Sequence, residues 1–172
     1  SDGLGAALAE ALAVRGVRLV LSARPSDRLT ALTARLGAEA VPMDVADGAS
    51  VQAAAAQIGP VDGLVWLAGV YWPMRAQDWD CTQVEAMCDI NFTGCARVLG
   101  AVLPDMVSRG TGHLVITGSL SGFRGLPGAV GYGASKAACM SLAETLYCDL
   151  RGTGVKVQLA NPGFIRTRLT AQ

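Results

Sequence analysis

The sequence predicts an α/β fold with a doubly wound parallel sheet of the Rossmann type, in three layers and one domain. Short apolar runs typical of buried strands alternate with helix-forming segments along the whole chain. The 21 glycines are concentrated where the apolar runs end. In such a sheet the carboxyl ends of the strands share one edge, and ligands bind there. The 172 residues suit a single domain, so we treat residues 1–172 as one unit.

Composition excludes several classes of function. Hydrophobic residues make up 51% of the chain and charged residues 16%, which argues against disorder. The formal net charge is zero, so the sequence predicts no broad basic surface for nucleic acid. It shows no apolar run long enough to span a bilayer and no signal peptide, so we expect no membrane partner.

The five cysteines predict no metal site, because they form no Cys-x-x-Cys pair and lack zinc-ligand spacing. Cys81, Cys88 and Cys95 recur every seven residues, which predicts that they share one helical face. We interpret them as small apolar packing residues. The odd number of cysteines is typical of reduced thiols, so we expect a cytoplasmic protein.

The first predicted element is a helix that begins directly after the first few residues. Glycines at a helix start let backbone amides approach a phosphate, and the helix N-terminus favours the anion. Gly3, Leu4 and Gly5 are therefore candidate cofactor-binding residues, although the same pattern also fits a tight turn. No strand precedes this helix, and the chain stops soon after a strand-like run. We expect the first strand and a C-terminal part to lie outside this sequence.

A strand is predicted over residues 17–21, after Gly16 closes the first helix. In dinucleotide-binding folds an acidic residue at this strand end binds the ribose 2′-hydroxyl, whereas a nearby arginine accommodates a 2′-phosphate. Here Ala23 takes the acidic position and Arg24 follows it, which favours NADP over NAD. The alternative is that Arg24 is an ordinary surface arginine.

Two further strands end in candidate cofactor-binding residues. After a helix over residues 26–36, a strand at 38–43 leads to Asp44 and Val45. Asp44 can accept a hydrogen bond from an adenine amino group or cap the helix predicted over residues 49–58. A strand at 61–67 is followed by Ala68 and Gly69, which are small enough to let a cofactor approach the backbone.

A long helix is predicted over residues 81–108, with Asn91 in its middle. An asparagine is locally unfavourable inside a helix, so Asn91 has either a functional role or a satisfied place in the core. The irregular aromatic segment 70–80 before it borders a substrate cleft or is a packed surface loop.

The segment 114–136 carries the strongest chemical pattern. An apolar strand ends near Ser119, and Tyr132 and Lys136 lie four residues apart at the start of a helix predicted over 132–151. An ammonium beside a phenol favours the phenolate and lowers the pKa of the tyrosine. The Ser119 hydroxyl could reach the same point. This set suits proton transfer at a carbonyl or alcohol oxygen, although Tyr132 alone could be a packing residue.

These motifs resemble those of the short-chain dehydrogenase/reductase family over essentially the whole chain. Ser119 lies thirteen positions before Tyr132, which is the family's spacing. After a strand predicted over 154–160, residues 161–167 read NPGFIRT and match the family's Pro-Gly-x-Ile/Val-x-Thr motif. Gly3 and Gly5 match the last two glycines of its phosphate loop. Residues 66–67 are Trp-Leu where the family usually has two asparagines.

The resemblance implies NADP-dependent oxidoreduction of a small carbonyl/alcohol substrate, with NAD as the less favoured cofactor. It implies that Tyr132 is the acid/base group and that Ser119 binds the reacting oxygen. It also implies that Lys136 lowers the pKa of Tyr132 and holds the nicotinamide ribose, and that Asn91 orders a relay water. The C-terminal motif supplies further cofactor contacts, namely Pro162, Gly163, Ile165 and Thr167.

The resemblance also implies a homodimer or homotetramer that assembles through the two long helices. A different reading is a nucleotide-binding regulatory or structural protein that keeps the fold without turnover. A third is a reductase that acts on a carrier-bound acyl chain.

Overall fold

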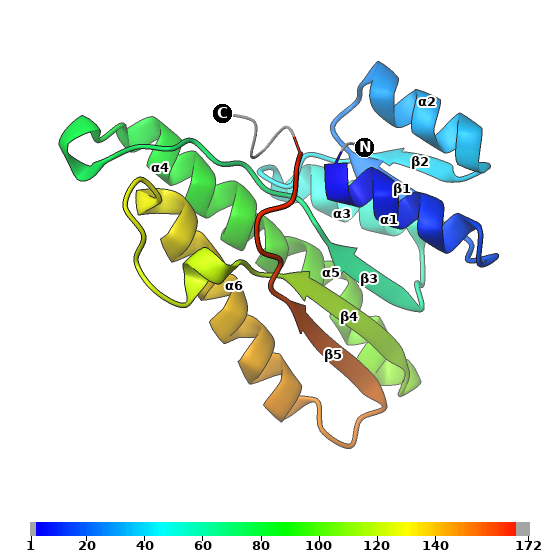
Figure 1. Cartoon of the computed structure of the whole chain (residues 1–172). Helices are drawn as coiled ribbons and strands as arrows, with labels where there is room; N and C mark the ends of the chain where they lie inside the picture. The colour runs from blue at the N-terminus through cyan, green and yellow to red at the C-terminus, as the bar shows by residue number, and fades with distance from the viewer. Residues whose placement is uncertain (1–2, 168–172) are drawn as a thin grey trace.

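The computed structural model describes residues 3–167 as five parallel strands and their connecting helices (Figure 1). The strands form two sheets, β1-β2 and β3-β4-β5, in which every neighbouring pair is parallel. The predicted doubly wound α/β class is therefore confirmed, and all strands direct their carboxyl ends to one edge. The strands are β1 (Val20–Ala23), β2 (Glu39–Pro42), β3 (Gly63–Trp66), β4 (Gly112–Thr117) and β5 (Val155–Ala160).

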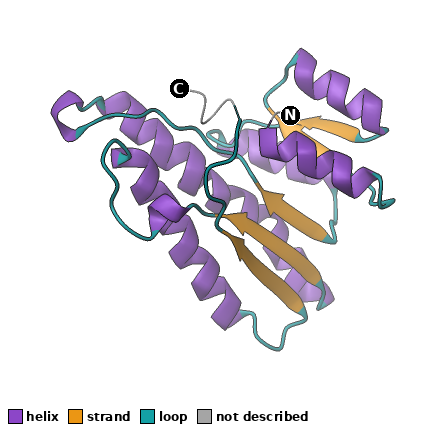
Figure 2. Ribbon diagram, viewed as in Figure 1, coloured by secondary structure: helices purple, strands orange, loops and turns teal. Residues whose placement is uncertain are grey.

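Helices connect successive strands and cover both faces of the sheets (Figure 2). As viewed in Figure 1, α1 lies in front of the sheet and contacts α2, whereas α3 and α5 pack together behind it, as do α4 and α6. The helices are α1 (Gly3–Ala13), α2 (Asp27–Leu36), α3 (Gly48–Ile58), α4 (Cys81–Cys88), α5 (Gly94–Arg109) and α6 (Val130–Asp149).

The order of the strands matches the doubly wound arrangement 3-2-1-4-5-6. Strands β2 and β1 take positions 3 and 2, and β3, β4 and β5 take positions 4, 5 and 6. Within residues 3–167 no strand lies between β1 and β3, so the described part of the chain does not include the first position.

The strand after α1 begins later than predicted. Its expected range was 17–21, but β1 covers Val20–Ala23. The reason is the turn that ends α1. Gly16 has a φ of 75°, and the Val17 N–H donates to Leu12 O at 3.2 Å, so the chain stays attached to the helix end before it extends.

Asp47 caps helix α3, and Asp44 does not. The Asp47 carboxylate accepts the Ala49 N–H at 2.9 Å. The Asp44 carboxylate accepts the Ala46 N–H at 3.0 Å and so closes the turn before the cap. The proposed capping role of Asp44 is therefore wrong, and its side chain is left at the carboxyl end of β2.

The predicted long helix extends over Cys81–Arg109 but contains a π-helical turn, Asp89–Thr93, between α4 and α5. A π turn inserts one residue and so rotates the later turns of the helix about its axis. Cys81 and Cys88 are consequently exposed, whereas Cys95 is buried. The predicted common face of these three cysteines is therefore wrong.

The same helix corrects the expectation about membranes. By length and composition alone Cys81–Arg109 could cross a bilayer, with a mean hydropathy of 1.3 in its most apolar window. A core helix passes the same test. Cys95, Val98, Leu99 and Met106 belong to the buried cluster that also contains Leu114 of β4, so we assign this helix to the core.

Gly118, directly after β4, supports the first testable prediction. A Cβ at this position would collide with the side-chain oxygen of Asn161 and lie 2.8 Å from Cγ of Met140. We expect Gly118→Ala to lower the free energy of unfolding by about 1–3 kcal/mol, because overpacking forces its neighbours apart. Urea denaturation measures the change.

Gly100→Ala is the matched control. Gly100 lies on an exposed part of α5, and no atom is within 4 Å of a Cβ placed there. Alanine is the better helix former by about 0.5–1 kcal/mol, so this variant should be slightly more stable. Equal stability of the two variants would contradict the proposed lack of space at Gly118.

Candidate active site

Tyr132 and Lys136 lie in the first turns of α6, which begins at Val130. The Tyr132 ring is half-buried, and the Lys136 side chain is buried with 4% of the residue exposed. The ammonium of Lys136 donates to Thr117 O at 3.0 Å and lies 5.8 Å from the centroid of the Tyr132 ring. The predicted pair therefore meets on one helical face, at the end of β4.

Ser119 reaches the same point from the end of β4. It is the N-cap of a short 3-10 helix, Leu120–Gly122, and its hydroxyl accepts the Ser121 N–H at 3.2 Å. The Ser119 and Ser121 hydroxyls are 2.9 Å apart and share a hydrogen bond. Ser119 also lies close enough to the Tyr132 phenol to affect its pKa.

The electrostatics of the pair differ from the expectation. Burial raises the pKa of Tyr132, and the nearby Ser119 hydroxyl opposes this rise without cancelling it. Burial lowers the pKa of Lys136. The expected lowering of the Tyr132 pKa by Lys136 is absent, because the ammonium is directed to the Thr117 carbonyl and not to the phenol.

Asn91 is completely buried in the π turn, with 0% of the residue exposed. Its carboxamide oxygen accepts the Val70 N–H at 2.7 Å. Its amide nitrogen donates to Val70 O at 3.0 Å and to the Ser135 hydroxyl at 2.9 Å. These bonds make Asn91 a satisfied core amide, which was the structural alternative. The expected relay water stays a prediction.

The π turn also connects α5 to the loop after β2. Arg97 pairs with Asp89 across the turn at 2.8 Å and donates to Val45 O at 3.1 Å. Val45 packs against Gly94, where a Cβ would lie 3.0 Å from it. Asp44 and Val45 are therefore held beside the helix that carries Asn91.

The candidate cofactor-binding residues gather at the edge formed by the strand carboxyl ends (Figure 1). Leu4 lies between Gly3 and Gly5 at the N-terminus of α1. Gly3 has a φ of 51°, and a Cβ on it would lie 3.0 Å from Thr167. The N-terminus of α1 thus meets the segment after β5.

The small pair Ala68-Gly69 comes soon after the end of β3. A Cβ on Gly69 would lie 3.2 Å from the Asn91 carboxamide oxygen and 3.7 Å from the Lys136 ammonium. This position therefore has no room for a side chain. Ala68 is a partly buried neighbour of the core cluster.

The remaining candidate cofactor-binding residues follow strands β1 and β5. Arg24 comes directly after β1 and is exposed. Pro162 and Gly163 come after β5, and Ile165 is exposed by 38%. A glycine cradle at a helix N-terminus, beside an exposed arginine, fits the phosphates of a dinucleotide.

Comparison with known proteins agrees with this geometry. Residues 1–172 match the family described as short chain dehydrogenase. The chain belongs to this family. An uncharacterized oxidoreductase of Myxococcus xanthus is 43% identical over 180 residues, which cover 99% of this chain and 71% of that protein.

Two other short-chain dehydrogenase relatives carry more specific names. Sulfoacetaldehyde reductase 2 of Chromohalobacter salexigens is 36% identical, over 99% of this chain and 71% of that protein. The structure of a short-chain dehydrogenase from Sphingobium yanoikuyae in complex with NADPH has a TM-score of 0.90 and 34% identity, and the match covers 98% of this chain and 69% of that one.

Trp66 and Leu67 depart from the family's usual asparagines without disturbing the site. Trp66 ends β3 and is buried in the core cluster, with 3% of the residue exposed. A Cβ on Gly5 would lie 3.8 Å from Leu67, so this leucine packs beside the N-terminus of α1. Apolar contacts thus occupy the positions of two polar side chains.

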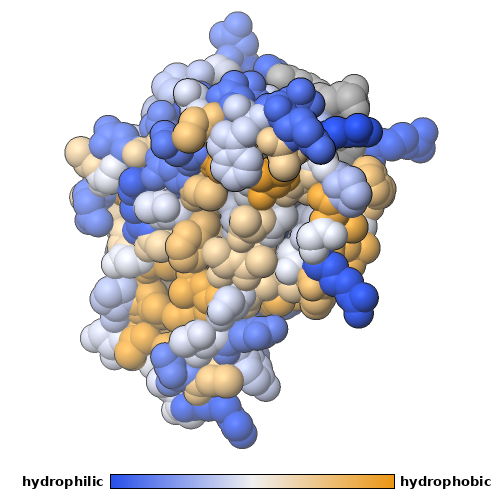
Figure 3. Space-filling view, turned by 90° about the vertical axis from the view of Figure 1, so that its left-hand side faces the viewer, coloured by the Kyte–Doolittle hydropathy of each residue, from blue (hydrophilic) through white to orange (hydrophobic). Residues whose placement is uncertain are grey.

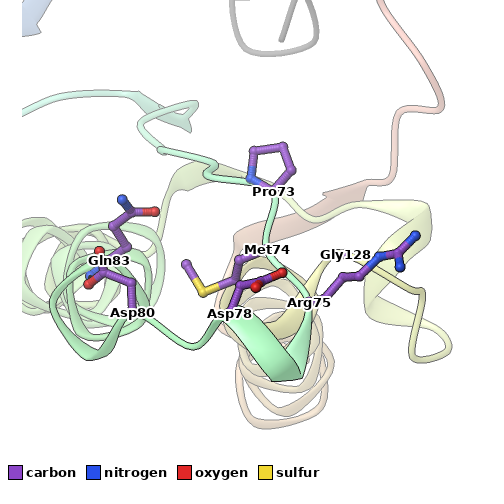
Figure 4. A pocket seen from close by; sticks show the side chains of 7 residues that line it. All are labelled: Pro73, Met74, Arg75, Asp78, Asp80, Gln83 and Gly128. Carbon is purple, nitrogen blue, oxygen red and sulfur yellow. The ribbon is translucent and has the colours of Figure 1, made fainter.

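An open cavity of about 490 Å³ lies between the segment after β3 and the start of α4 (Figure 4). Its walls are mixed in polarity and include Arg75, Asp78, Asp80 and Gln83. Gly128, close before α6, forms another part of the wall. The segment 70–80 therefore borders a cavity, and its predicted role beside a substrate cleft stays a prediction.

The structure adds residues that the sequence analysis did not single out. The Asn161 carboxamide oxygen is buried without a hydrogen-bond partner in the described part of the chain. Ser135 links Asn91 to α6. The Tyr71 ring contacts the Tyr132 ring. A tyrosine three positions after Ala68 was a visible signal, but its partner lies 61 positions away and only the fold brings the two together.

The direction of the Tyr132 pKa gives the second prediction. Since burial disfavours the phenolate, we expect the Tyr132 phenol to ionise at a higher pH than free tyrosine and to stay protonated at neutral pH. The ultraviolet absorbance of phenolate, followed against pH in the wild type and in Tyr132→Phe, measures this. Tyr147→Phe, at a tyrosine exposed by 60%, is the control. Ionisation of Tyr132 below the ordinary range would contradict the prediction.

Proposed function

We propose that this short-chain dehydrogenase interconverts a small carbonyl compound and its alcohol with NADP(H), and that Tyr132 is the acid/base group. The observation that carries the proposal is the meeting of the Tyr132 phenol, the Lys136 ammonium and the Ser119 hydroxyl at the carboxyl end of β4. When bound, the cofactor supplies or accepts the hydride.

In the proposed reduction, the Tyr132 phenol donates its proton to the carbonyl oxygen. Burial supports this role, because it keeps the phenol protonated at neutral pH. The Ser119 hydroxyl donates a hydrogen bond to the same oxygen and stabilises the developing negative charge. The Lys136 ammonium lies near both the ring and Gly69, where it would contact the nicotinamide ribose.

Residues of five segments at the carboxyl ends of the strands would contact the cofactor. Gly3, Leu4 and Gly5 would approach the pyrophosphate, and Asp44 would accept from the adenine amino group. Arg24 would bind the 2′-phosphate of NADP, and the neighbouring Ala23 offers no carboxylate to repel it. The remaining contacts, assigned by family resemblance, are Val45, Ala68, Gly69, Pro162, Gly163, Ile165 and Thr167.

We also propose that the protein acts as a cytoplasmic homodimer or homotetramer through its long helices. An apolar area supports this on the side of the molecule where α4 and α6 lie (Figure 3). Val107 of α5 is exposed by 41%. Contiguous apolar areas on a protein surface are typical of sites that bind another protein.

The third prediction concerns the acid/base group. Tyr132→Phe keeps the ring but removes the transferable proton, so we expect loss of turnover with nearly unchanged NADPH binding. NADPH oxidation with a panel of aldehydes and ketones that includes sulfoacetaldehyde measures turnover, and fluorescence titration measures binding. Tyr147→Phe is the control.

The same assay separates the two classes of function. Near-normal turnover of Tyr132→Phe would refute the assignment of the acid/base group. NADPH binding by the wild type without turnover across the panel would favour a nucleotide-binding protein that lacks enzyme activity. The apolar Trp66-Leu67 pair gives that alternative its support.

The fourth prediction concerns the choice of cofactor. A charge-assisted contact between Arg24 and the 2′-phosphate should contribute about 1.5–3 kcal/mol, which is about one to two decades of preference. We expect the wild type to bind NADPH more tightly than NADH and Arg24→Ala to lose most of that ratio. Arg151→Ala, after the far end of α6, is the control. An unchanged ratio in Arg24→Ala would mean that the phosphate is bound elsewhere.

A further inference from the structure

Tyr71 lies against the proposed acid/base ring. The centroids of the Tyr71 and Tyr132 rings are 4.7 Å apart, and the ring planes are inclined at 47°. Both residues are half-buried. Tilted aromatic pairs at this separation attract each other beyond the simple burial of their surfaces, so the contact favours one orientation of each ring.

The residues next to Tyr132 cannot support its ring. Gly131 and Gly133 flank it in the sequence, and neither has a side chain. A Cβ at Gly131 would lie 2.7 Å from Met87, and one at Gly133 would lie 3.1 Å from Ser121 O, so both positions are tight for a larger residue. The ring therefore gains no support from its immediate neighbours in the sequence.

The hydroxyl of Tyr71 ties it to the segment that leads into α6. It donates to Gly128 O at 3.4 Å, and the Met74 N–H donates to the same carbonyl at 3.0 Å. Met74 and Ala129 also form a parallel β-bridge. The segment after β3 therefore runs beside the residues that precede Tyr132.

Hydrogen bonds through Asn91 and Ser135 also connect the backbone next to Tyr71 with the backbone of Tyr132. The carboxamide of Asn91 binds both the N–H and the C=O of Val70, next to Tyr71. The Ser135 hydroxyl accepts from Asn91 and donates to Tyr132 O at 2.8 Å. The backbone beside Tyr71 and the backbone of Tyr132 are thus held to one frame.

We propose that Tyr71 is a positioning residue that holds the Tyr132 phenol in the orientation needed for proton transfer. The Tyr71 ring blocks rotation of the Tyr132 ring and shields it from water, and the bond to Gly128 keeps the Tyr71 ring in place. This inference rests on the proposed function, in which Tyr132 donates the proton. No bond is made or broken at Tyr71 itself.

The test uses the environment of Tyr132 as its first readout, because this requires no substrate. The chain has three tyrosines, so ¹³C labelling at the phenolic carbon gives three signals, and Tyr132→Phe identifies the one from Tyr132. In Tyr71→Leu we expect the Tyr132 signal to move and its titration to shift toward that of free tyrosine, because the ring gains contact with water. Tyr71→Phe keeps a ring at this position and should preserve most of the shielding.

The second readout is reduction of sulfoacetaldehyde by NADPH. We expect Tyr71→Leu to lower kcat by about 10- to 100-fold, since a misplaced reacting group slows proton transfer, with little change in the KM for NADPH. Tyr71→Phe should recover most of this loss. If the wild type does not reduce sulfoacetaldehyde, the proposed substrate class is wrong for this compound, and the labelled spectra still decide the role of Tyr71.

Tyr147→Leu is the control for the loss of a tyrosine elsewhere on α6, and urea denaturation checks that each variant is folded. If Tyr71→Leu does not fold, Tyr71→Met replaces it. Methionine has about the volume of leucine, but its longer, flexible side chain adapts more easily to the space. A Tyr132 signal and titration that are the same in the wild type, Tyr71→Phe and the aliphatic variant would overturn the proposal. Loss of stability with an unchanged Tyr132 titration would also overturn it, because that result identifies a purely structural residue.

Discussion

The buried carboxamide of Asn91 is the interaction on which the arrangement of the site depends. An amide that is removed from water without partners costs about 1–3 kcal/mol for each unsatisfied group, so its bonds must be complete. Asn91 meets this requirement by binding both backbone groups of Val70 and the Ser135 hydroxyl. These partners belong to the segment after β3 and to α6. One side chain in the π turn therefore sets the separation of the two segments that carry Tyr71 and Tyr132.

Lys136 can be buried near Asn91 because its ammonium group has a hydrogen-bond acceptor there. Lys136 is 4% exposed, and its ammonium has a carbonyl partner in Thr117 at 3.0 Å. The lowered pKa of Lys136 and the raised pKa of Tyr132 have one cause, which is that burial disfavours the charged form of each group. Burial thus favours the protonated phenol, which suits proton donation to a carbonyl oxygen. Oxidation of an alcohol would need the phenolate, and an added positive charge near the ring would be required to stabilise it.

The sequence was sufficient for the fold class and for predicting which candidate residues lie close together, and the physical reason is periodicity. Residues four apart on a helix share a face, so Tyr132 and Lys136 could be paired without a structure. Parallel strands share one edge, so Gly3, Asp44, Gly69 and Ser119 could be assigned to one region. Features that break periodicity were not predictable. The π turn rotates α5 relative to α4, and it alone explains why Cys95 is buried while Cys88 is exposed.

The sequence also did not predict contacts between distant segments. Nor did it predict how burial and nearby charges together shift the pKa of a side chain. The Tyr71 contact depends on how the segment after β3 crosses the start of α6, which no local pattern encodes. The direction of the Tyr132 pKa depends on where the Lys136 ammonium points, and a spacing of four residues does not specify this.

The Trp66-Leu67 pair shows which parts of the family's motif the geometry requires. Gly69 must be small, because Asn91 and Lys136 lie within 4 Å of the space that its Cβ would occupy. Trp66 and Leu67 face the core and the start of α1, where apolar groups can fill the same volume. The indole N–H of Trp66 is buried without a partner in the described residues, which is the cost of this replacement. The replaced positions therefore affect how the sheet is stabilised, whereas the positions that contact Lys136 and Asn91 retain the small residues that the site requires.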